Sequence, residues 1–215
     1  MKRRSYRLGL REESVDRHRA DILAAAREVF SEAGYHGASL EEVALRAGVS
    51  RKTVYYQFGA KVGLLDALVS DLESSAELAQ RVEAIIEKPA RITLREYFLE
   101  VCRFWQLNQD FARALSALGA TDADARKVIN KHDRARRRRL TTLVALLATR
   151  GELRKDSDQE RAVDLLWLLS SFGSFDHLVT RSRLTPEMAA SLLTNAAAVL
   201  LEDRTVVLRN RRTEV

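Results

Sequence analysis

Proline is scarce in this chain, which has only Pro89 and Pro186 among its 215 residues. Because proline removes a backbone donor and ends a helix, the long stretches between these positions are free to form helices. Alanine, leucine, arginine and glutamate dominate them, and all four are good helix formers. With 46% hydrophobic residues, the chain is also long enough for a sizeable core. The sequence therefore predicts an all-α fold.

Apolar residues recur at helical spacing along most of the chain, and they predict about nine helices. The expected ranges are 17–34, 40–47, 51–58, 61–88, 93–107, 110–118, 122–150, 158–179 and 186–201. Ser39, Ser50, Thr121 and Thr185 stand where N-caps are expected. Gly119 and Gly151 are expected to follow helix ends.

The positive charge is concentrated at the N-terminus. The formal net charge is +6, and "MKRRSYRLGLR" contains five basic residues and no acidic one, whereas 12–50 is net acidic. A local basic cluster favours a polyanionic partner. This stretch is either a disordered solubilising tail or an arm in which Arg3, Arg4 and Arg7 lie along the minor groove of DNA.

Cys102 is the only cysteine, so the chain can form neither an intrachain disulfide nor a cysteine cluster for a metal. Its thiol is either a small buried apolar group or a reactive nucleophile. No apolar run is long enough to span a bilayer, and we expect a cytoplasmic, nucleoid-associated protein without a membrane partner. No nucleophile, base and orienting group stand at useful spacing, so neither an enzyme nor a cofactor is predicted.

The stretch "VSRKTVYYQF" separates two kinds of side chain on its expected helix. At about 100° per residue, Val54 and Phe58 fall on one face, while an arc opposite carries Arg51, Lys52, Tyr55 and Tyr56. The tyrosines either lie at the rim of a core or face a partner. Basic side chains neutralise phosphates and bind guanine, and a tyrosine ring contacts a thymine methyl group. Three short helices with a glycine-containing turn match a helix-turn-helix.

From Ala20 to Leu68, "ADILAAAREVFSEAGYHGASLEEVALRAGVSRKTVYYQFGAKVGLLDAL" resembles the DNA-binding domain of the TetR family of bacterial transcriptional regulators. The resemblance implies base contacts from Arg51, Lys52 and Tyr56. It implies phosphate contacts from Ser39, Thr53, Tyr55, Gln57 and Lys61. Gln57 departs from the family pattern, which often has histidine or an aromatic residue there. Gly63 also departs from it by replacing a common acidic residue.

The family resemblance implies a domain plan and a set of partners. The expected parts are a basic arm (1–14), a helix-turn-helix domain (15–60), an effector-binding and dimerisation domain (61–202) and a tail (203–215). The implied function is a homodimeric regulator, with repression favoured over activation, that binds a palindromic double-stranded DNA operator and is released by a small apolar or aromatic effector. An architectural, low-specificity DNA binder without effector control is the alternative.

The resemblance also implies an effector pocket and a dimer interface in the C-terminal part. Candidate pocket residues are Phe98, Cys102, Trp105, Leu143, Leu147 and Trp167. The alternative is that these side chains simply fill a core. Candidate interface residues are Trp167, Ser171, Phe172, Phe175, Leu192, Ala196 and Val199. The alternative for them is an intramolecular core.

The run "KHDRARRRRL" contains Arg134 and Arg136 to Arg139. Such density is compatible with a phosphate site, but consecutive residues spread around a helix and cannot all converge on one anion. A solvated face that pairs with acidic residues elsewhere is therefore the favoured interpretation.

Overall fold

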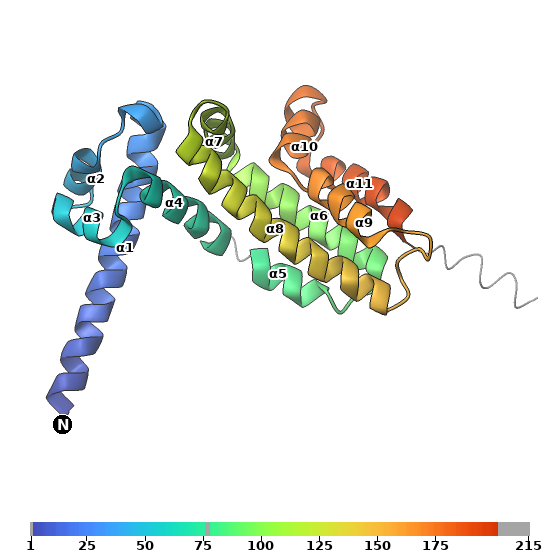
Figure 1. Cartoon of the computed structure of the whole chain (residues 1–215), viewed down its shortest axis with the longest axis horizontal. Helices are drawn as coiled ribbons and strands as arrows, with labels where there is room; N and C mark the ends of the chain where they lie inside the picture. Colours follow the sequence, from blue (N-terminus) through green and yellow to red (C-terminus); the bar gives the residue numbers. More distant parts are fainter. Residues whose placement is uncertain (1, 76–77, 202–215) are drawn as a thin grey trace, which may run out of the picture. The chain divides into compact units, whose positions relative to one another are not determined.

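The computed structural model describes residues 2–75 and 78–201, and these ranges are almost entirely helical (Figure 1). The helices are α1 (Lys2–Gly37), α2 (Leu40–Arg46), α3 (Arg51–Phe58), α4 (Lys61–Ser75), α5 (Leu78–Ile85), α6 (Ala90–Leu107), α7 (Gln109–Thr121), α8 (Ala123–Thr149), α9 (Gln159–Leu169), α10 (Phe172–Asp176) and α11 (Pro186–Ala197). A π-helical turn follows α10 at His177–Arg181, and a 3₁₀ turn follows α11 at Ala198–Leu200. The predicted all-α fold is confirmed. None of the described helices is both long and apolar enough to cross a membrane.

The chain forms two compact units. The first comprises Met1–Glu73 and Arg113–Asn130, and the second comprises Ser74–Ala112 and Lys131–Val215. The first unit thus contains α1 to α3, most of α4 and the hairpin where α7 ends and α8 begins. The tail predicted at 203–215 lies outside the described residues.

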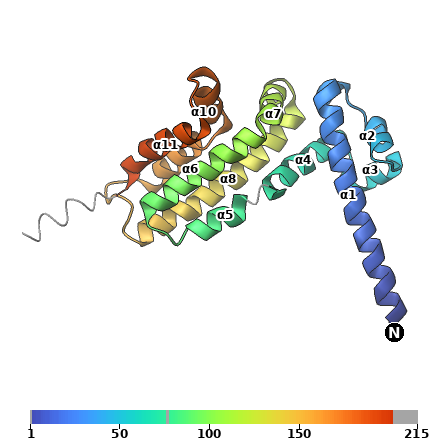
Figure 2. The same cartoon turned by 180° about the vertical axis from the view of Figure 1, so that it is seen from behind.

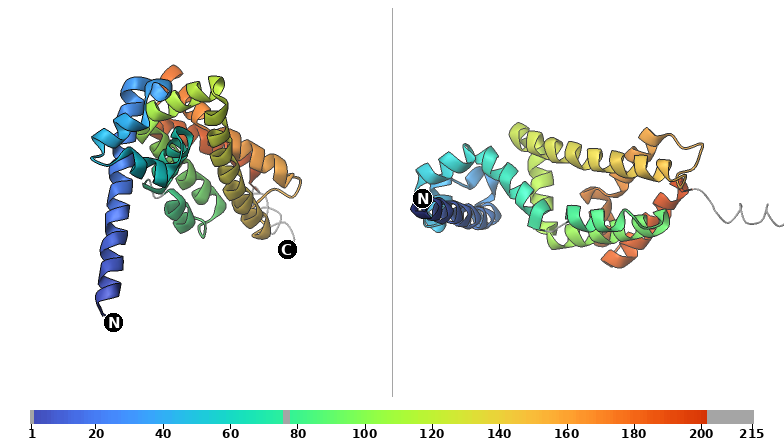
Figure 3. Two further views of the ribbon diagram at one scale, coloured as in Figure 1. Left: turned by 60° about the vertical axis from the view of Figure 1, so that its left-hand side comes forward. Right: turned by 90° about the horizontal axis from the view of Figure 1, so that it is seen from below.

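The basic N-terminus is the first part of α1, which begins at Lys2 rather than near residue 17. Figure 3 shows this part of α1 extending past α2 and α3. The backbone of the predicted arm is therefore helical, although the side chains of Arg3, Arg4 and Arg7 lie outside the described ones. The helix kinks at Gly34, whose φ of 66° is a left-handed conformation that glycine adopts readily.

Two serine caps define the helix-turn-helix, as predicted. Ser39 Oγ accepts a hydrogen bond from Glu42 N at 3.1 Å at the start of α2, and Ser50 Oγ accepts one from Thr53 N at 3.1 Å at the start of α3. Between them, Gly48 turns the chain with a φ of 64°. The buried side chains of Val54 and Phe58 hold α3 to the unit, so the inner face predicted for this helix is confirmed.

Several predicted helix boundaries are wrong. The expected helix over 61–88 is divided into α4 and α5, and these belong to different units. The expected helix over 158–179 breaks at Ser170–Ser171, where Ser171 Oγ accepts a hydrogen bond from Ser174 N at 3.2 Å and begins α10. Local apolar spacing is continuous across both breaks and cannot reveal them.

Two predicted end signals near the α7–α8 turn are also wrong. Asp122, not Thr121, caps α8, because its carboxylate accepts hydrogen bonds from the backbone N–H groups of residues 124 and 125 at 2.9 and 2.8 Å. Gly119 lies inside α7, where an added Cβ would lie 2.3 Å from Ile129 Cδ1 of α8. The glycine therefore permits close packing of the two helices instead of ending one. The predicted cap at Thr185 is confirmed.

The second unit is built around α6. This helix packs against α5 and α11, and Figure 2 shows it alongside α11. The largest fully buried side chains include Phe98 on α6, Leu147 on α8, Leu166 on α9 and Phe175 on α10. One continuous hydrophobic cluster thus joins α5, α6 and α8 to α11.

Candidate DNA-binding surface

Two exposed aromatic rings lie on the outer face of α3, in the first unit. Tyr56 is 89% exposed and Tyr55 is 64% exposed, and Arg51 and Lys52 are exposed beside them. Because these rings are exposed, they do not contribute to the core of the unit. Because this surface combines groups that contact base edges with groups that neutralise phosphates on one short helix, it suits the major groove.

Arg51 is positioned by an ion pair that sequence analysis did not identify. Its Nη1 lies 2.8 Å from Glu41 Oε1 at the start of α2, and both side chains are more than half exposed. An exposed pair contributes little to stability. The pair does orient the guanidinium of Arg51, which is predicted to contact a base. The only sign of this pair in the sequence was the acidic residue Glu41 in the first turn of α2.

Ser39 and Thr53 use their polar groups within the domain. Ser39 Oγ accepts the N-cap hydrogen bond of α2, and Thr53 Oγ1 lies 2.8 Å from Ser50 Oγ. An N-cap oxygen still carries a hydroxyl proton, which is free to be donated to a phosphate. Both residues also lie at helix N-termini, where the backbone favours anions.

Lys61 is engaged with the end of α1. Its Nζ donates hydrogen bonds to the carbonyl oxygens of His36 and Ala38 at 3.2 and 3.0 Å and lies 4.7 Å from the centre of the Tyr35 ring. His36 in turn lies 3.9 Å from Asp122, the cap of α8. In this arrangement Lys61 fixes the α1–α2 turn, and a phosphate contact would require its ammonium group to leave these carbonyls.

The structure explains the departure from the family pattern at Gly63 but not at Gln57. Gln57 is half-buried, and its Oε1 has no hydrogen-bond partner within the described residues. A Cβ at residue 63 would lie 2.0 Å from the carbonyl oxygen of Phe58. Glycine is therefore the residue that lets the start of α4 approach the end of α3.

Two ion pairs join the supporting helices, and a third lies within α2. Arg46 of α2 pairs with Glu32 of α1 at 2.7 Å and with Glu42 at 2.8 Å, and Arg27 of α1 lies 3.8 Å from Asp71 of α4. The hydrogen bond from Arg46 lowers the pKa of Glu32. These contacts fix α2 against α1, so α3 is presented on a firm base.

The candidate pocket residues all lie within or against the hydrophobic cluster of the second unit. Phe98, Cys102, Leu143 and Leu147 are buried, and Trp105 and Trp167 pack against the cluster as partly buried residues. All six side chains therefore belong to or border one hydrophobic cluster. Here they pack as a filled core.

Cys102 is expected to be unreactive in the folded protein. Burial, followed by the nearby charge of Glu187, raises the pKa of its thiol to about 12, so the nucleophilic thiolate is scarce at neutral pH. A disulfide-exchange reagent at pH 8 should label no thiol in the native protein and one thiol per chain after denaturation. Rapid labelling of the native protein at one thiol per chain would contradict this assignment.

The candidate interface residues separate into three groups by their exposure. On α11, Leu192 is 49% exposed and Val199, just beyond its end, is 60% exposed, and Ala196 is exposed beside them. Trp167, Ser171 and Phe172 are half-buried. Phe175 is 1% exposed and belongs to the core of its own chain, so it is not available to a partner.

The expected solvated arginine face is wrong at one position. Arg138 and Arg139 are exposed, but the Arg136 side chain is only 17% exposed and turns toward the end of α9. Arg137 is half-exposed and pairs with Asp164 of α9. Helical periodicity explains why one arginine of the run points inward.

Residues 22–68 match the model of the tetR family of bacterial regulatory proteins. The transcriptional activator FasR of Mycolicibacterium smegmatis is 38% identical over 84 residues, which cover 34% of this chain and 38% of that protein. The transcriptional repressor NicS of Pseudomonas putida is 27% identical over 108 residues, which cover 50% of this chain and 51% of that one. The matches therefore span about half or less of these curated relatives.

Solved structures resemble a larger part of the chain. A TetR transcription regulator from Haloarcula marismortui is 20% identical with a TM-score of 0.64, covering 86% of this chain and 98% of that one. The fatty acid degradation regulator FadR from Bacillus halodurans is 18% identical with a TM-score of 0.66, covering 87% and 96%. At these identities the likeness concerns the fold.

The capped helix-turn-helix, its exposed basic and aromatic face and the all-helical second unit define a DNA-binding protein of the helix-turn-helix class. The match over α1 to α4 is specific within that class. Residues 22–68 match the TetR family of bacterial regulatory proteins, and the relatives named above are described as a transcriptional activator and a transcriptional repressor.

The two tyrosines of α3 are expected to contribute differently to DNA binding. The more exposed Tyr56 is assigned to a base, so Tyr56→Ala should reduce the preference at one base pair by about 1 kcal/mol, the low end of the cost of a mismatch. Tyr55→Phe removes a hydroxyl assigned to a phosphate and should weaken binding to all sequences alike. Binding isotherms with single-base variants of a bound duplex measure both effects. The opposite pattern would mean that the two assignments are reversed.

Proposed function

We propose that this protein is a one-component transcriptional regulator that binds a palindromic DNA operator as a homodimer. The observation that supports it best is the face of α3, where Tyr56 is 89% exposed next to Tyr55, Arg51 and Lys52 on a helix held by buried Val54 and Phe58. Basic and aromatic groups that are exposed on a helix anchored by buried side chains are placed to enter the major groove.

The proposed residue roles are those that the resemblance to the TetR family implies. Arg51, Lys52 and Tyr56 read base edges, with Glu41 orienting Arg51. Phosphate contacts come from Ser39, Thr53 and Tyr55. Gln57 and Lys61 are also assigned to phosphates, although both are half-buried and Lys61 donates a hydrogen bond to the Ala38 carbonyl oxygen. The helical N-terminal part of α1, which contains Arg3, Arg4 and Arg7, supplies further charge toward the duplex.

A homodimer accounts for the exposed apolar side chains of α11. Met188, Leu192 and Val199 are each about half exposed or more. A single helix-turn-helix reads only a few base pairs, and a two-fold pair reads two half-sites about one DNA turn apart. Packing of α11 against its copy would bury these side chains and set that spacing.

Effector control is assigned to the hydrophobic cluster of the second unit. An apolar or aromatic effector among Phe98, Cys102, Trp105, Leu143, Leu147 and Trp167 would act on α8, which continues from one unit into the other. Release of DNA requires the effector to prefer the conformation that does not fit the operator. Repression lifted by the effector is the mode of control that we propose for this cytoplasmic protein.

Selection of bound DNA from a random pool tests this function. The purified protein is incubated with random duplexes, and retained sequences are amplified and reselected. We expect a palindrome whose half-sites are about one turn apart. Enrichment of no sequence would favour the alternative, an architectural DNA binder of low specificity.

A further inference from the structure

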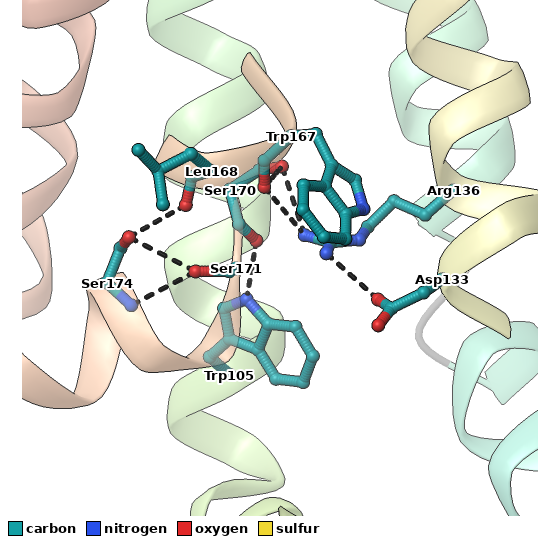
Figure 4. Close-up of polar contacts among 8 residues, drawn as sticks. All are labelled: Trp105, Asp133, Arg136, Trp167, Leu168, Ser170, Ser171 and Ser174. Atoms are coloured by element: carbon teal, nitrogen blue, oxygen red, sulfur yellow. Dashed lines mark hydrogen bonds and ion pairs between the residues drawn. The ribbon is translucent and has the colours of Figure 1, made fainter. Parts of the chain in front are cut away.

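Hydrogen-bond donors from two helices converge on the C-terminal end of α9, where the helix is interrupted before α10 begins. Trp105 Nε1 of α6 donates a hydrogen bond to the carbonyl oxygen of Ser170 at 3.1 Å. Arg136 Nη1 of α8 donates to Ser170 Oγ at 3.2 Å and to the carbonyl oxygen of Trp167 at 3.4 Å. Figure 4 shows these groups facing one another. The break is thus a polar point inside an otherwise apolar unit.

Arg136 carries a largely buried positive charge at this point. Its side chain is 17% exposed, and its only carboxylate within the described contacts is Asp133, 3.0 Å away and one turn earlier on α8. The Asp133 side chain is 38% exposed. A neighbour so exposed is able to turn into water, whereas the guanidinium cannot leave without losing its hydrogen bonds to the Ser170 hydroxyl and the Trp167 carbonyl oxygen.

Trp167 presents a second donor beside that charge. Its Nε1 is buried and has no hydrogen-bond partner among the described residues. Its ring lies 5.5 Å below the Arg136 guanidinium. A buried donor without an acceptor carries a free-energy cost. An acceptor that reached both Arg136 and this indole would recover that cost.

Aromatic rings continue from this polar point toward the core. The Trp105 ring lies 4.8 Å from Phe104 and 5.3 Å from Phe172, and Phe172 lies 6.4 Å from Phe175. Phe172 is half-buried and stands at the start of α10, a helix of five residues.

We propose that this cluster binds the carboxylate of an amphipathic acid with an apolar or aromatic body. One carboxylate oxygen accepts from Arg136 in place of Asp133, and the other accepts from Trp167 Nε1. The apolar body displaces the Phe172 ring and packs on Trp105 toward Phe98. The proposal rests on the proposed function, since it gives the chemical class of the effector.

Affinity measurements with matched acids and alcohols test the site. Decanoate with decanol, and 4-phenylbutyrate with 4-phenylbutanol, differ within each pair in the charged head group. Binding to the full-length protein is measured by calorimetry and by intrinsic fluorescence. The chain has only two tryptophans, Trp105 and Trp167, and both lie at the site, so fluorescence reports directly on it. The acids should bind more tightly than the alcohols.

Three variants separate ligand binding from a structural function of the ion pair. Arg136→Gln should weaken binding of the acids about tenfold to a hundredfold, the range for a hydrogen bond to a charged group. Asp133→Asn should strengthen it, because the competing carboxylate is gone. Arg138→Gln removes an exposed charge from the same helix and should leave the affinity for the acids unchanged. Melting curves confirm that each variant is folded.

Several outcomes would overturn this inference. They are no binding of either acid, equal affinity for acid and alcohol, unchanged affinity in Arg136→Gln, or equal losses in Arg136→Gln and Asp133→Asn. The last would show that the pair is only structural. These results are independent of DNA: a protein that binds decanoate through Arg136 but selects no palindrome would refute the proposed function alone.

Discussion

Leu192→Arg is expected to turn the proposed dimer into a monomer and to weaken operator binding about a hundredfold or more. The reason is that linking two DNA-binding domains raises affinity by factors of about 10²–10⁴. The side chain is 49% exposed on α11, so an arginine is compatible with the folded chain. In a two-fold interface the change places two charges against the same apolar surface. Sedimentation velocity and binding isotherms measure the two effects.

Leu107→Arg is the matched control for this variant. Leu107, at the end of α6, is 73% exposed and lies on another helix. The control should remain dimeric with unchanged operator affinity. If both arginine variants are monomeric, or both bind DNA as the wild type does, α11 is not the interface.

Gly63→Ala is expected to destabilise the first unit by about 1–3 kcal/mol, the usual cost of overpacking. The new Cβ would lie 2.0 Å from the carbonyl oxygen of Phe58, a backbone atom that moves only if the end of α3 moves. Since α3 carries the DNA-binding face, operator affinity should fall as well. Urea unfolding monitored by circular dichroism, together with binding isotherms, measures both losses.

Gly37→Ala serves as the comparison. An added Cβ at residue 37 meets only Ala33 Cβ, at 3.5 Å, which is ordinary contact. The substitution also reduces the entropy of the unfolded chain, so stability should be unchanged or slightly higher. Equal stability of Gly63→Ala and the wild type would show that the α3–α4 junction is looser than the structure indicates.

Local chemistry explains which parts of this fold were predictable. Ser39, Ser50 and Thr185 cap helices with their own hydroxyl groups, and a cap needs only the next turn of chain to form. The two faces of α3 follow from helical geometry in the same way. For these reasons the all-α fold and the exposed residues of α3 could be predicted from sequence.

The remaining features depend on contacts between distant residues. The break at Ser170 is stabilised by Trp105 and Arg136, which lie 65 and 34 positions away. Arg136 resembles its neighbours in sequence, and only packing against α9 makes it buried. Lys61 likewise binds carbonyls 25 and 23 residues earlier. No local pattern reports such pairs.

The ratio of specific to non-specific affinity tests the central claim most directly. The palindrome recovered by selection is compared with a scrambled duplex of the same length and composition, at one fixed salt concentration. A regulator should prefer the palindrome at least about a thousandfold, the lower range for specific DNA-binding proteins. A ratio near one would contradict the account and identify a DNA-binding protein without an operator.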